Sequence, residues 1–225
     1  MLLLVTDTSG RMGNVALVQA ESASSDSVQL IEAAPLSGGA FSAQLVPQIA
    51  ALLARHHFSK TDIHAFIVVA GPGSFTGLRV GLAAIKALAE ILAKPIVPVS
   101  LLEVVAVASA REGKIEAILD AGRGDVYAGQ YEIAGNVVRL LREQLFSKSE
   151  LAAASEGFVV ATPDPALATV ARDSALPVVE IAPVDAAMIA RLGLKKLLAG
   201  ETVAPDLLDA NYGRRSDAEI FIKGK

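Results

Sequence analysis

The sequence of 225 residues contains no cysteine and no tryptophan, and only 4% of its residues are aromatic. Without cysteine the chain can form neither disulfides nor thiolate metal sites, and it has no cysteine nucleophile. A reducing compartment suits such a chain, so we expect a cytoplasmic protein. The N-terminal stretch MLLLVTD reaches Asp7 after six residues and has no basic leader, which predicts a first strand and not a signal peptide.

The chain also lacks an excess of positive charge. Its formal net charge is -4 and its isoelectric point is near 5.4. Proteins that hold nucleic acid do so largely because Lys and Arg displace counterions from phosphate, so we expect any contact with RNA to need a partner. No uninterrupted apolar run is as long as a membrane span, and we expect no membrane contact. The hydrophobic content of 52% is enough for one large core or two small ones.

The chain contains an order of predicted elements that occurs twice. In each half, three Val-, Ile- and Leu-rich strands precede a helix, a strand, a helix, a strand and a final helix. The first of these helices, expected over 41–56, places five apolar residues on one face: Phe41, Leu45, Ile49, Leu52 and Leu53. The pattern predicts an α/β protein with two βββαβαβα lobes, 1–111 and 112–225, joined near 111–113 and separated by a cleft.

The repeat is also visible in the residues themselves. The stretches LLLVTDTSGRMGNVALVQ and EAILDAGRGDVYAGQY share a hydrophobic strand, an Asp, a Gly-containing turn and a second strand, so that Asp7 corresponds to Asp120. Facing hairpins of this kind can hold a nucleotide's phosphates, with Asp binding a metal ion or a water. Alternatively, the polar residues only satisfy tight turns. The candidate nucleotide-binding residues are Asp7, Thr8, Ser9, Asp120, Gly122 and Gly124.

The stretch VVAGPGSFTGLRVG, from Val68 to Gly81, matches neither common phosphate-binding motif. A Walker loop needs a lysine before Ser or Thr, and here no lysine follows until Lys86. The dinucleotide fingerprint fails because Thr76 stands where its third glycine should be. Two interpretations stay open: the helix N-terminus binds an anion, or the small residues Gly77, Gly81 and Ala84 form a stripe that lets another helix approach closely.

Histidines and the basic C-terminus are weaker signals. His56 and His57 are adjacent and would point about 100° apart on a helix, so they cannot share a metal as an i, i+4 pair can. The terminal segment NYGRRSDAEIFIKGK carries Arg214 and Arg215. It is either a solvated tail or a basic contact for RNA or an acidic partner.

Five stretches together resemble the TsaB/YeaZ family of bacterial tRNA threonylcarbamoyladenosine biosynthesis proteins. They occur in the family's order across nearly the whole chain, and GPGSFTGLRVG is the most specific of them. The stretches are LLLVTDTSGRMGNVALV, VAGPGSFTGLRVGLAAIKALAE, PIVPVSLLEVVA, LDAGRGDVYAGQY and YGRRSDAE. The resemblance implies the actin-like ATPase fold, shared by sugar kinases, Hsp70 and actin, which agrees with the duplicated element order.

The resemblance also implies a function in forming threonylcarbamoyladenosine at the tRNA position 3′ of the anticodon. It implies a non-catalytic subunit that binds a catalytic paralogue, TsaD, with a TsaE-like ATPase joining and tRNA held indirectly through the complex. The paralogue's metal-binding HxxxH pair corresponds here to Leu101 and Val105, which cannot ligate a metal. We expect no metal and no cofactor required by this chain itself, with ATP or ADP bound in the complex.

Partner docking then gives the small-residue stripe a use. We expect the interface at the start of the helix after the Gly-Pro-Gly turn, and alone the chain could form a homodimer through the same surface. The candidate interface residues are Gly73, Ser74, Thr76, Gly77, Val80, Gly81 and Ala84. The alternative function is an enzyme of the same fold, either a nucleotide-dependent phosphotransferase with Asp7 and Asp120 at its cleft or a peptidase-like enzyme.

Overall fold

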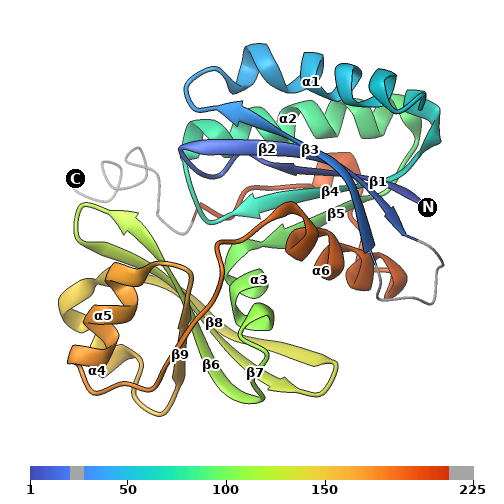
Figure 1. Ribbon diagram of the computed structural model, residues 1–225. Helices are drawn as coiled ribbons and strands as arrows, with labels where there is room; N and C mark the ends of the chain where they lie inside the picture. Colours follow the sequence, from blue (N-terminus) through green and yellow to red (C-terminus); the bar gives the residue numbers. More distant parts are fainter. Residues whose placement is uncertain (21–27, 213–225) are drawn as a thin grey trace, which may run out of the picture. The chain divides into compact units, whose positions relative to one another are not determined.

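The computed structural model describes residues 1–20 and 28–212 (Figure 1). These residues form two compact units with a five-stranded sheet each. The first unit combines Met1–Ser100 with Asp185–Asn211, and the second contains Leu101–Val184. This division differs from the lobes expected at 1–111 and 112–225. The helix after Ser100 belongs to the second unit, and the last helix returns to the first.

The sheet of the first unit has the order β3-β2-β1-β4-β5. Its strands are β1 (Leu2–Asp7), β2 (Met12–Ala20), β3 (Val28–Ser37), β4 (Ile63–Gly71) and β5 (Ile96–Ser100). β1 pairs antiparallel with β2, where Leu4 lies opposite Leu17, and β2 pairs antiparallel with β3. The pairs β1–β4 and β4–β5 are parallel, which requires helical crossover connections.

Helices cover both faces of this first sheet (Figure 1). They are α1 (Phe41–Arg55) and α2 (Phe75–Leu92) on one face and α6 (Ala186–Leu198) on the other, with short turns η1 (Lys60–Asp62) and η3 (Pro205–Leu207). The five residues predicted to form the buried face of α1 are all buried, which confirms that prediction. On β1, Leu2 and Leu4 pack in the core beneath α1 and α2. Leu3 and Val5 alternate with them and face the α6 side.

The second unit repeats this topology with the order β10-β9-β6-β7-β8. Its elements are α3 (Leu101–Ala108), β6 (Gly113–Gly122), β7 (Asp125–Ala134), β8 (Val137–Ser147), η2 (Lys148–Glu150), α4 (Leu151–Ala154), β9 (Val159–Thr162), α5 (Pro165–Asp173) and β10 (Val178–Glu180). One core lies between α3 and the sheet, and a second lies under α4 and α5. β6 therefore takes the central place that β1 has in the first sheet, so Asp7 and Asp120 are equivalent in topology.

The duplicated element order is confirmed, and the differences from prediction lie in element lengths. The sequence predicts strands over 28–33 and 137–141, and the structure extends them: β3 ends at Ser37 and β8 at Ser147. The sequence also predicts a helix over 147–154. The structure has one 3-10 turn and one short α-helical turn there, because Ser147 and Glu150 form a capping box that starts a 3-10 turn at this point.

A C-terminal segment closes the edge of the first sheet after α6. The amide of Val203 donates to the carbonyl of Ile96 on edge strand β5 at 2.9 Å. Leu208 then inserts into the core under α2, where it is 2% exposed. The amide of Asn211 donates to the carbonyl of Ala70 at 2.7 Å, at the end of β4. Val203 thus satisfies one backbone carbonyl of the edge strand, and Asn211 satisfies one at the end of β4.

The small residues of α2 let this helix approach the end of β1 closely. A Cβ atom at Gly77 would meet the carbonyl oxygen of Thr8, and one at Gly81 would meet the Thr8 hydroxyl. That hydroxyl donates to the carbonyl of Gly77 at 2.8 Å, and Thr8 is 2% exposed. The glycines therefore pack against the chain's own β1–β2 turn.

We expect Gly81→Ala to lower the free energy of unfolding by about 1–3 kcal/mol, because the added methyl group overpacks against Thr8. In a Thr8→Ala background the same change should cost less, since the hydroxyl and methyl groups nearest to the new Cβ are gone. Chemical unfolding of the four proteins in this double-mutant cycle measures the coupling. Strictly additive free energies would contradict the proposed contact.

Candidate functional site

The Gly-Pro-Gly loop before α2 packs on the turn between β1 and β2. The amide of Ser74 donates to the carbonyl of Ser9 at 2.7 Å, and a Cβ at Gly73 would collide with Ser9. Gly71 has φ +136, and a side chain there would collide with the backbone of Asn211. Both glycines are thus required by close backbone approach. The Ser74 hydroxyl accepts from the amide of Gly77 at 3.3 Å and caps α2.

The predicted interface residues divide by exposure. Gly77 and Gly81 are buried inside the first unit, so in this structure a partner cannot contact the glycine stripe itself. Ser74 and Thr76 are exposed, whereas Gly73, Val80 and Ala84 are partly exposed. The docking hypothesis therefore depends on the exposed residues of α2 and not on its glycines.

The Asp7–Ser9 turn has its polar groups engaged within the chain. The amide and the hydroxyl of Ser9 donate to Oδ1 of Asp7 at 2.9 and 2.6 Å. Burial raises the pKa of the Asp7 carboxyl group, and the two hydrogen bonds from Ser9 partly oppose that rise. Asp7, Thr8 and Ser9 thus make the contacts expected of a tight turn, while nucleotide binding by them stays a prediction.

One polar atom beside Asp7 is left without a partner among the described residues. Asn14 on β2 is the cross-strand neighbour of Asp7, and its Oδ1 atom is buried and accepts no hydrogen bond. A buried acceptor beside a buried carboxyl group needs a donor or a cation. This is the feature of the turn that favours a bound ligand.

The equivalent turn of the second unit is more open. Asp120 forms an ion pair with Lys148 at 2.9 Å, and both side chains are more than a third exposed. Gly122 and Gly124 have φ of +71 and +88, and a Cβ at either would contact nothing within 4 Å. The amide of Lys148 donates to the carbonyl of Gly124 at 2.8 Å. The residues after β8 therefore brace this turn through both the backbone and the side chain of Lys148.

The positions matched to the paralogue's metal ligands lie on α3. Val105 is fully buried in the core between α3 and the second sheet, and Leu101 at the start of the helix is partly buried. Within residues 1–20 and 28–212, no group of three or more His, Cys, Asp or Glu side chains is arranged to hold a metal ion. No helix of that same part of the chain is long and apolar enough to cross a bilayer.

Several other predicted features can now be located. Arg214 and Arg215 lie outside the described residues. Nε2 of His56, at the end of α1, lies 2.7 Å from Oε2 of Glu32. Nδ1 of His64 accepts a hydrogen bond from the amide of Leu2 at 3.0 Å.

Two features escaped the sequence analysis. At the start of α2 the guanidinium group of Arg79 lies 3.8 Å from the ring centroid of Phe75, which is 40% exposed. Their i, i+4 spacing was the available signal. In β6, Glu116 is fully buried. Its signal was an acidic residue inside the apolar run IEAIL.

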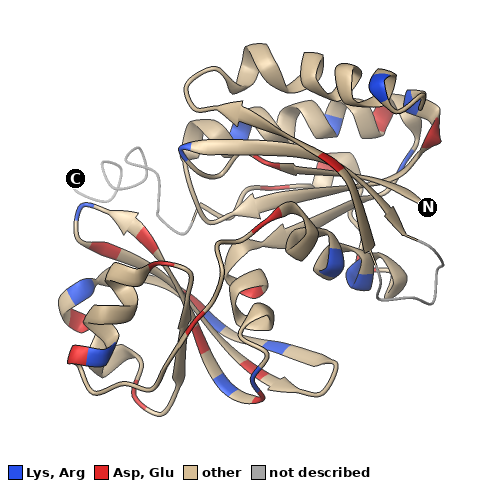
Figure 2. Cartoon of the chain, in the orientation of Figure 1, with Lys and Arg blue, Asp and Glu red and all other residues tan. Residues whose placement is uncertain are grey.

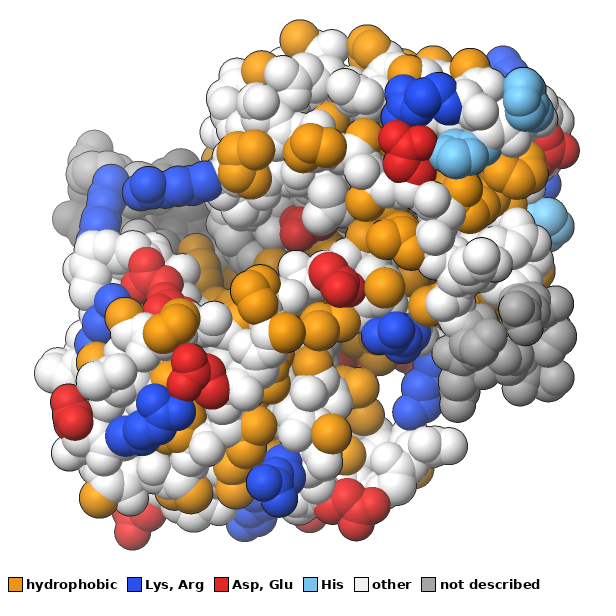
Figure 3. Space-filling model, viewed as in Figure 1, with side chains coloured by type: hydrophobic (Ala, Val, Ile, Leu, Met, Phe, Trp, Pro, Cys, Tyr) orange, Lys and Arg blue, Asp and Glu red, His pale blue; other side chains and the backbone are white. Residues whose placement is uncertain are grey.

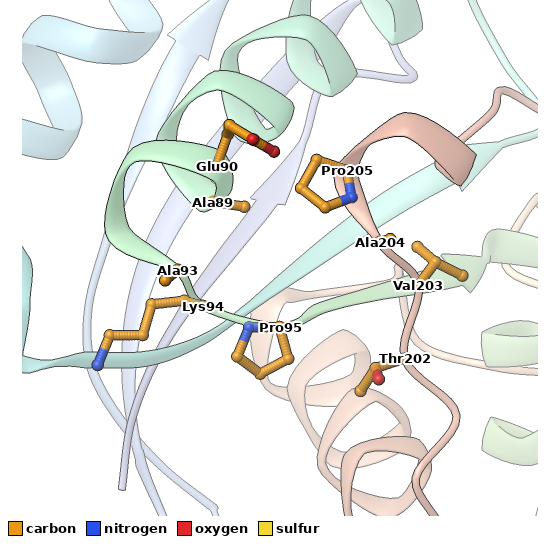
Figure 4. Close-up of a pocket in the computed structure, with 9 residues that line it drawn as sticks. All are labelled: Ala89, Glu90, Ala93, Lys94, Pro95, Thr202, Val203, Ala204 and Pro205. Atoms are coloured by element: carbon orange, nitrogen blue, oxygen red, sulfur yellow. The ribbon is translucent and has the colours of Figure 1, made fainter.

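A groove of about 410 Å³ lies at the C-terminal end of α2 (Figure 4). Glu90 and Lys94 are its charged lining residues, and the segment from Thr202 to Pro205 forms its other wall. It lies at the opposite end of α2 from the Gly-Pro-Gly loop. None of the residues predicted from the sequence to bind a ligand or a partner lines it.

Comparison with known proteins agrees with this architecture. The family model TsaD, described as tRNA N6-adenosine threonylcarbamoyltransferase, matches residues 36–196. The chain is 34% identical over 134 residues to the tRNA threonylcarbamoyladenosine biosynthesis protein TsaB of Bacillus subtilis, covering 59% of this chain and 56% of that protein. It is 34% identical over 92 residues to TsaB of Escherichia coli, covering 40% of each. The chain thus spans about half the length of the curated relatives it matches.

The solved structure of YeaZ from Pseudomonas aeruginosa superposes with a TM-score of 0.72 at 22% identity, over 94% of this chain and 99% of that one. This likeness confirms the predicted α/β fold class, which the described residues build from two mixed five-stranded sheets. With the family model covering most of the sequence, the chain belongs to the TsaB/YeaZ family.

Proposed function

We propose that this chain takes part in forming threonylcarbamoyladenosine in tRNA, as a non-catalytic subunit that binds a TsaD-like catalytic partner. Family membership and the names of the curated relatives support the pathway. The apolar pair Leu101 and Val105, at the positions matched to the paralogue's metal ligands, supports a role without metal catalysis. A TsaE-like ATPase would join the complex, and tRNA would be held through it.

The observation that carries the docking proposal is the outer surface of α1 and α2. Figure 2 shows that charged residues are sparse on these helices, with Arg55 at the end of α1 and Arg79, Lys86 and Glu90 on α2. Exposed residues of the outer surface are mostly apolar, and Val46 and Ile91 are 49% and 74% exposed. The exposed apolar residues of the two helices are Ala43, Val46, Pro47, Ala50, Ala54, Phe75, Ala83, Ala87 and Ile91.

Burying these apolar side chains against a partner protein is more favourable than leaving them in water. Hydrophobic side chains also lie exposed over the upper part of the space-filling view (Figure 3). Apolar exposed patches of this kind mark interaction sites, and small residues such as Ala let a partner helix approach closely. The guanidinium group of Arg79 stacks on the ring of Phe75. Aromatic residues and arginine are enriched at protein interfaces. The same surface would hold a second copy of the chain when the partner is absent.

The Asp7–Asn14 pair favours a second candidate function, the binding of ATP or ADP with a divalent cation. The buried, unpartnered Oδ1 of Asn14 beside the Asp7 carboxyl group supports this proposal. Mg²⁺ is commonly held by one or two protein oxygens together with phosphates and waters, so two such ligands are sufficient. Within the proposed complex this chain would then contribute a nucleotide site without performing the transfer.

We expect a one-to-one complex between this chain and its TsaD-like paralogue, measured by size-exclusion chromatography with light scattering. Ala83→Arg on the exposed face of α2 should weaken the complex at least about tenfold, because it places a charge in an apolar contact. Gly81→Arg is unsuitable, since Gly81 is buried and the variant would disturb the fold. Ala166→Arg, exposed on α5 of the second unit, is the matched control. An unchanged affinity in Ala83→Arg, or no complex with the wild type, would refute the docking surface.

We expect Mg-ADP to bind with an affinity that falls at least about tenfold in Asp7→Asn, measured by isothermal titration calorimetry on the chain alone and in the complex. The substitution removes a charge but keeps an oxygen that can accept from Ser9. Asp173→Asn, exposed at the end of α5 in the second unit and in no candidate site, is the matched control. Equal binding by wild type and Asp7→Asn would show that the nucleotide binds elsewhere.

A further inference from the structure

The groove at the C-terminal end of α2 has a largely apolar lining. Apart from two charged residues and Thr202, its lining residues are alanine, valine and proline. One wall is the end of α2 and the turn after it, and the other is the segment 202–205 (Figure 4). The amide of Val203 donates to the carbonyl of Ile96 at 2.9 Å, which holds that segment against β5. A side chain that enters the groove would therefore contact mostly apolar surface.

The two most exposed large hydrophobic side chains of the described residues are sequence neighbours of this lining. Ile91 is 74% exposed and follows Glu90 on α2. Leu207 is 71% exposed and lies on η3, two residues after Pro205. η3 packs against α2, and residues of both elements line the groove. Exposed apolar clusters mark interaction sites, and at Ile91 this one continues the outer surface of α2.

The two charged lining residues point in different directions. In Figure 4 the carboxyl group of Glu90 points across the groove toward Pro205, whereas the ammonium group of Lys94 points away from that wall. Hydrogen bonds from Ser59 lower the pKa of Asp62, and the positive charge of Lys94 adds to that effect, so the charge of Lys94 is directed toward η1. Glu90 forms no ion pair with another described residue. The groove therefore contains a carboxylate whose charge is not compensated.

The end of α2 adds negative potential at the same place. The carbonyl groups of a helix's last turn point out of its C-terminal end and carry a partial negative charge. α2 has no basic residue in its last turn. Pro95 has no N–H group and cannot donate to the carbonyl of Ile91, four residues earlier. The groove thus combines an apolar lining with a carboxylate and a helix end that both attract positive charge.

These features decide which chemistry the groove can bind. An acidic side chain would be repelled by Glu90 and by the helix end. A purely apolar segment would cover the Glu90 carboxylate without giving it a partner, which is costly. A Lys or Arg side chain flanked by apolar residues satisfies both requirements, because its aliphatic part packs on the lining while its charged group pairs with the carboxylate.

We propose that this groove binds a basic side chain of the docked partner protein, and that apolar residues beside it in the partner pack on Ile91 and Leu207. The inference rests on the proposed function, since it takes the TsaD-like subunit as the partner. The basic group pairs with Glu90, and its aliphatic part packs on Ala204 and Pro205. Apolar helix faces can slide on one another, and a charge pair at one end of α2 fixes the register of the partner on this surface.

The test is the affinity of the complex with the TsaD-like paralogue, measured by isothermal titration calorimetry at several NaCl concentrations. Glu90→Gln should weaken the complex about threefold to tenfold and reduce its salt dependence, and Glu90→Lys should weaken it further, because attraction becomes repulsion. Glu156→Lys, exposed in the second unit, is the control for the charge change and should bind as wild type. Wild-type affinity in Glu90→Lys would overturn the groove contact and leave the proposed function standing. Absence of a wild-type complex would overturn both.

Filling the groove gives a second test that does not depend on charge. Ala204 is an exposed lining residue, so Ala204→Phe adds a ring that occupies the groove without disturbing the core. This variant should weaken the complex at least about tenfold. Lys94→Gln should not weaken it, because the ammonium group of Lys94 points away from the opposite wall. Unchanged affinity in Ala204→Phe would mean that nothing enters the groove. A larger loss in Lys94→Gln than in Glu90→Gln would mean an acidic occupant, and either result would overturn the proposal.

Discussion

The close contact between α2 and the end of β1 organises the first unit. Gly77 and Gly81 bring the helix axis close enough for the Thr8 hydroxyl to donate to a helix carbonyl. The same approach lets Ser74 bind the carbonyl of Ser9. The Gly-Pro-Gly loop and the Asp7 turn are therefore one packed structure, and any side chain larger than hydrogen on this helix face would separate them.

This packing leaves the opposite side of α2 available. Because the glycines face inward, Ala83, Ala87 and Ile91 face outward beside the uncharged surface of α1. An inner face of glycine and an outer face of alanine give one helix two close-packing surfaces, one toward its own sheet and one toward a partner. The proposed docking role thus rests on the same helix that builds the core.

The two units share a topology but use it differently. In β1 the central strand is apolar from Leu2 to Val5, whereas in β6 the carboxyl group of Glu116 interrupts the apolar run. The first turn is buried under α2, while the second is exposed and depends on Lys148 for its contacts. The first turn is therefore held by packing against α2, and the second by the contacts of Lys148.

The sequence alone determined the fold class, the doubled element order and the buried face of α1, because hydrophobic periodicity reports which side of an element meets the core. It also showed that GPGSFTG is not a Walker loop. Only the tertiary structure decided that Gly77 and Gly81 face Thr8, that α6 returns to the first unit, and that Ser155 lies beside Glu116. Those contacts join residues about 40 to 180 positions apart. The local sequence pattern shows which side of an element is apolar but not which distant element packs against it. The shortening of α4 was equally hidden, since a capping box can start either a 3-10 turn or an α-helix.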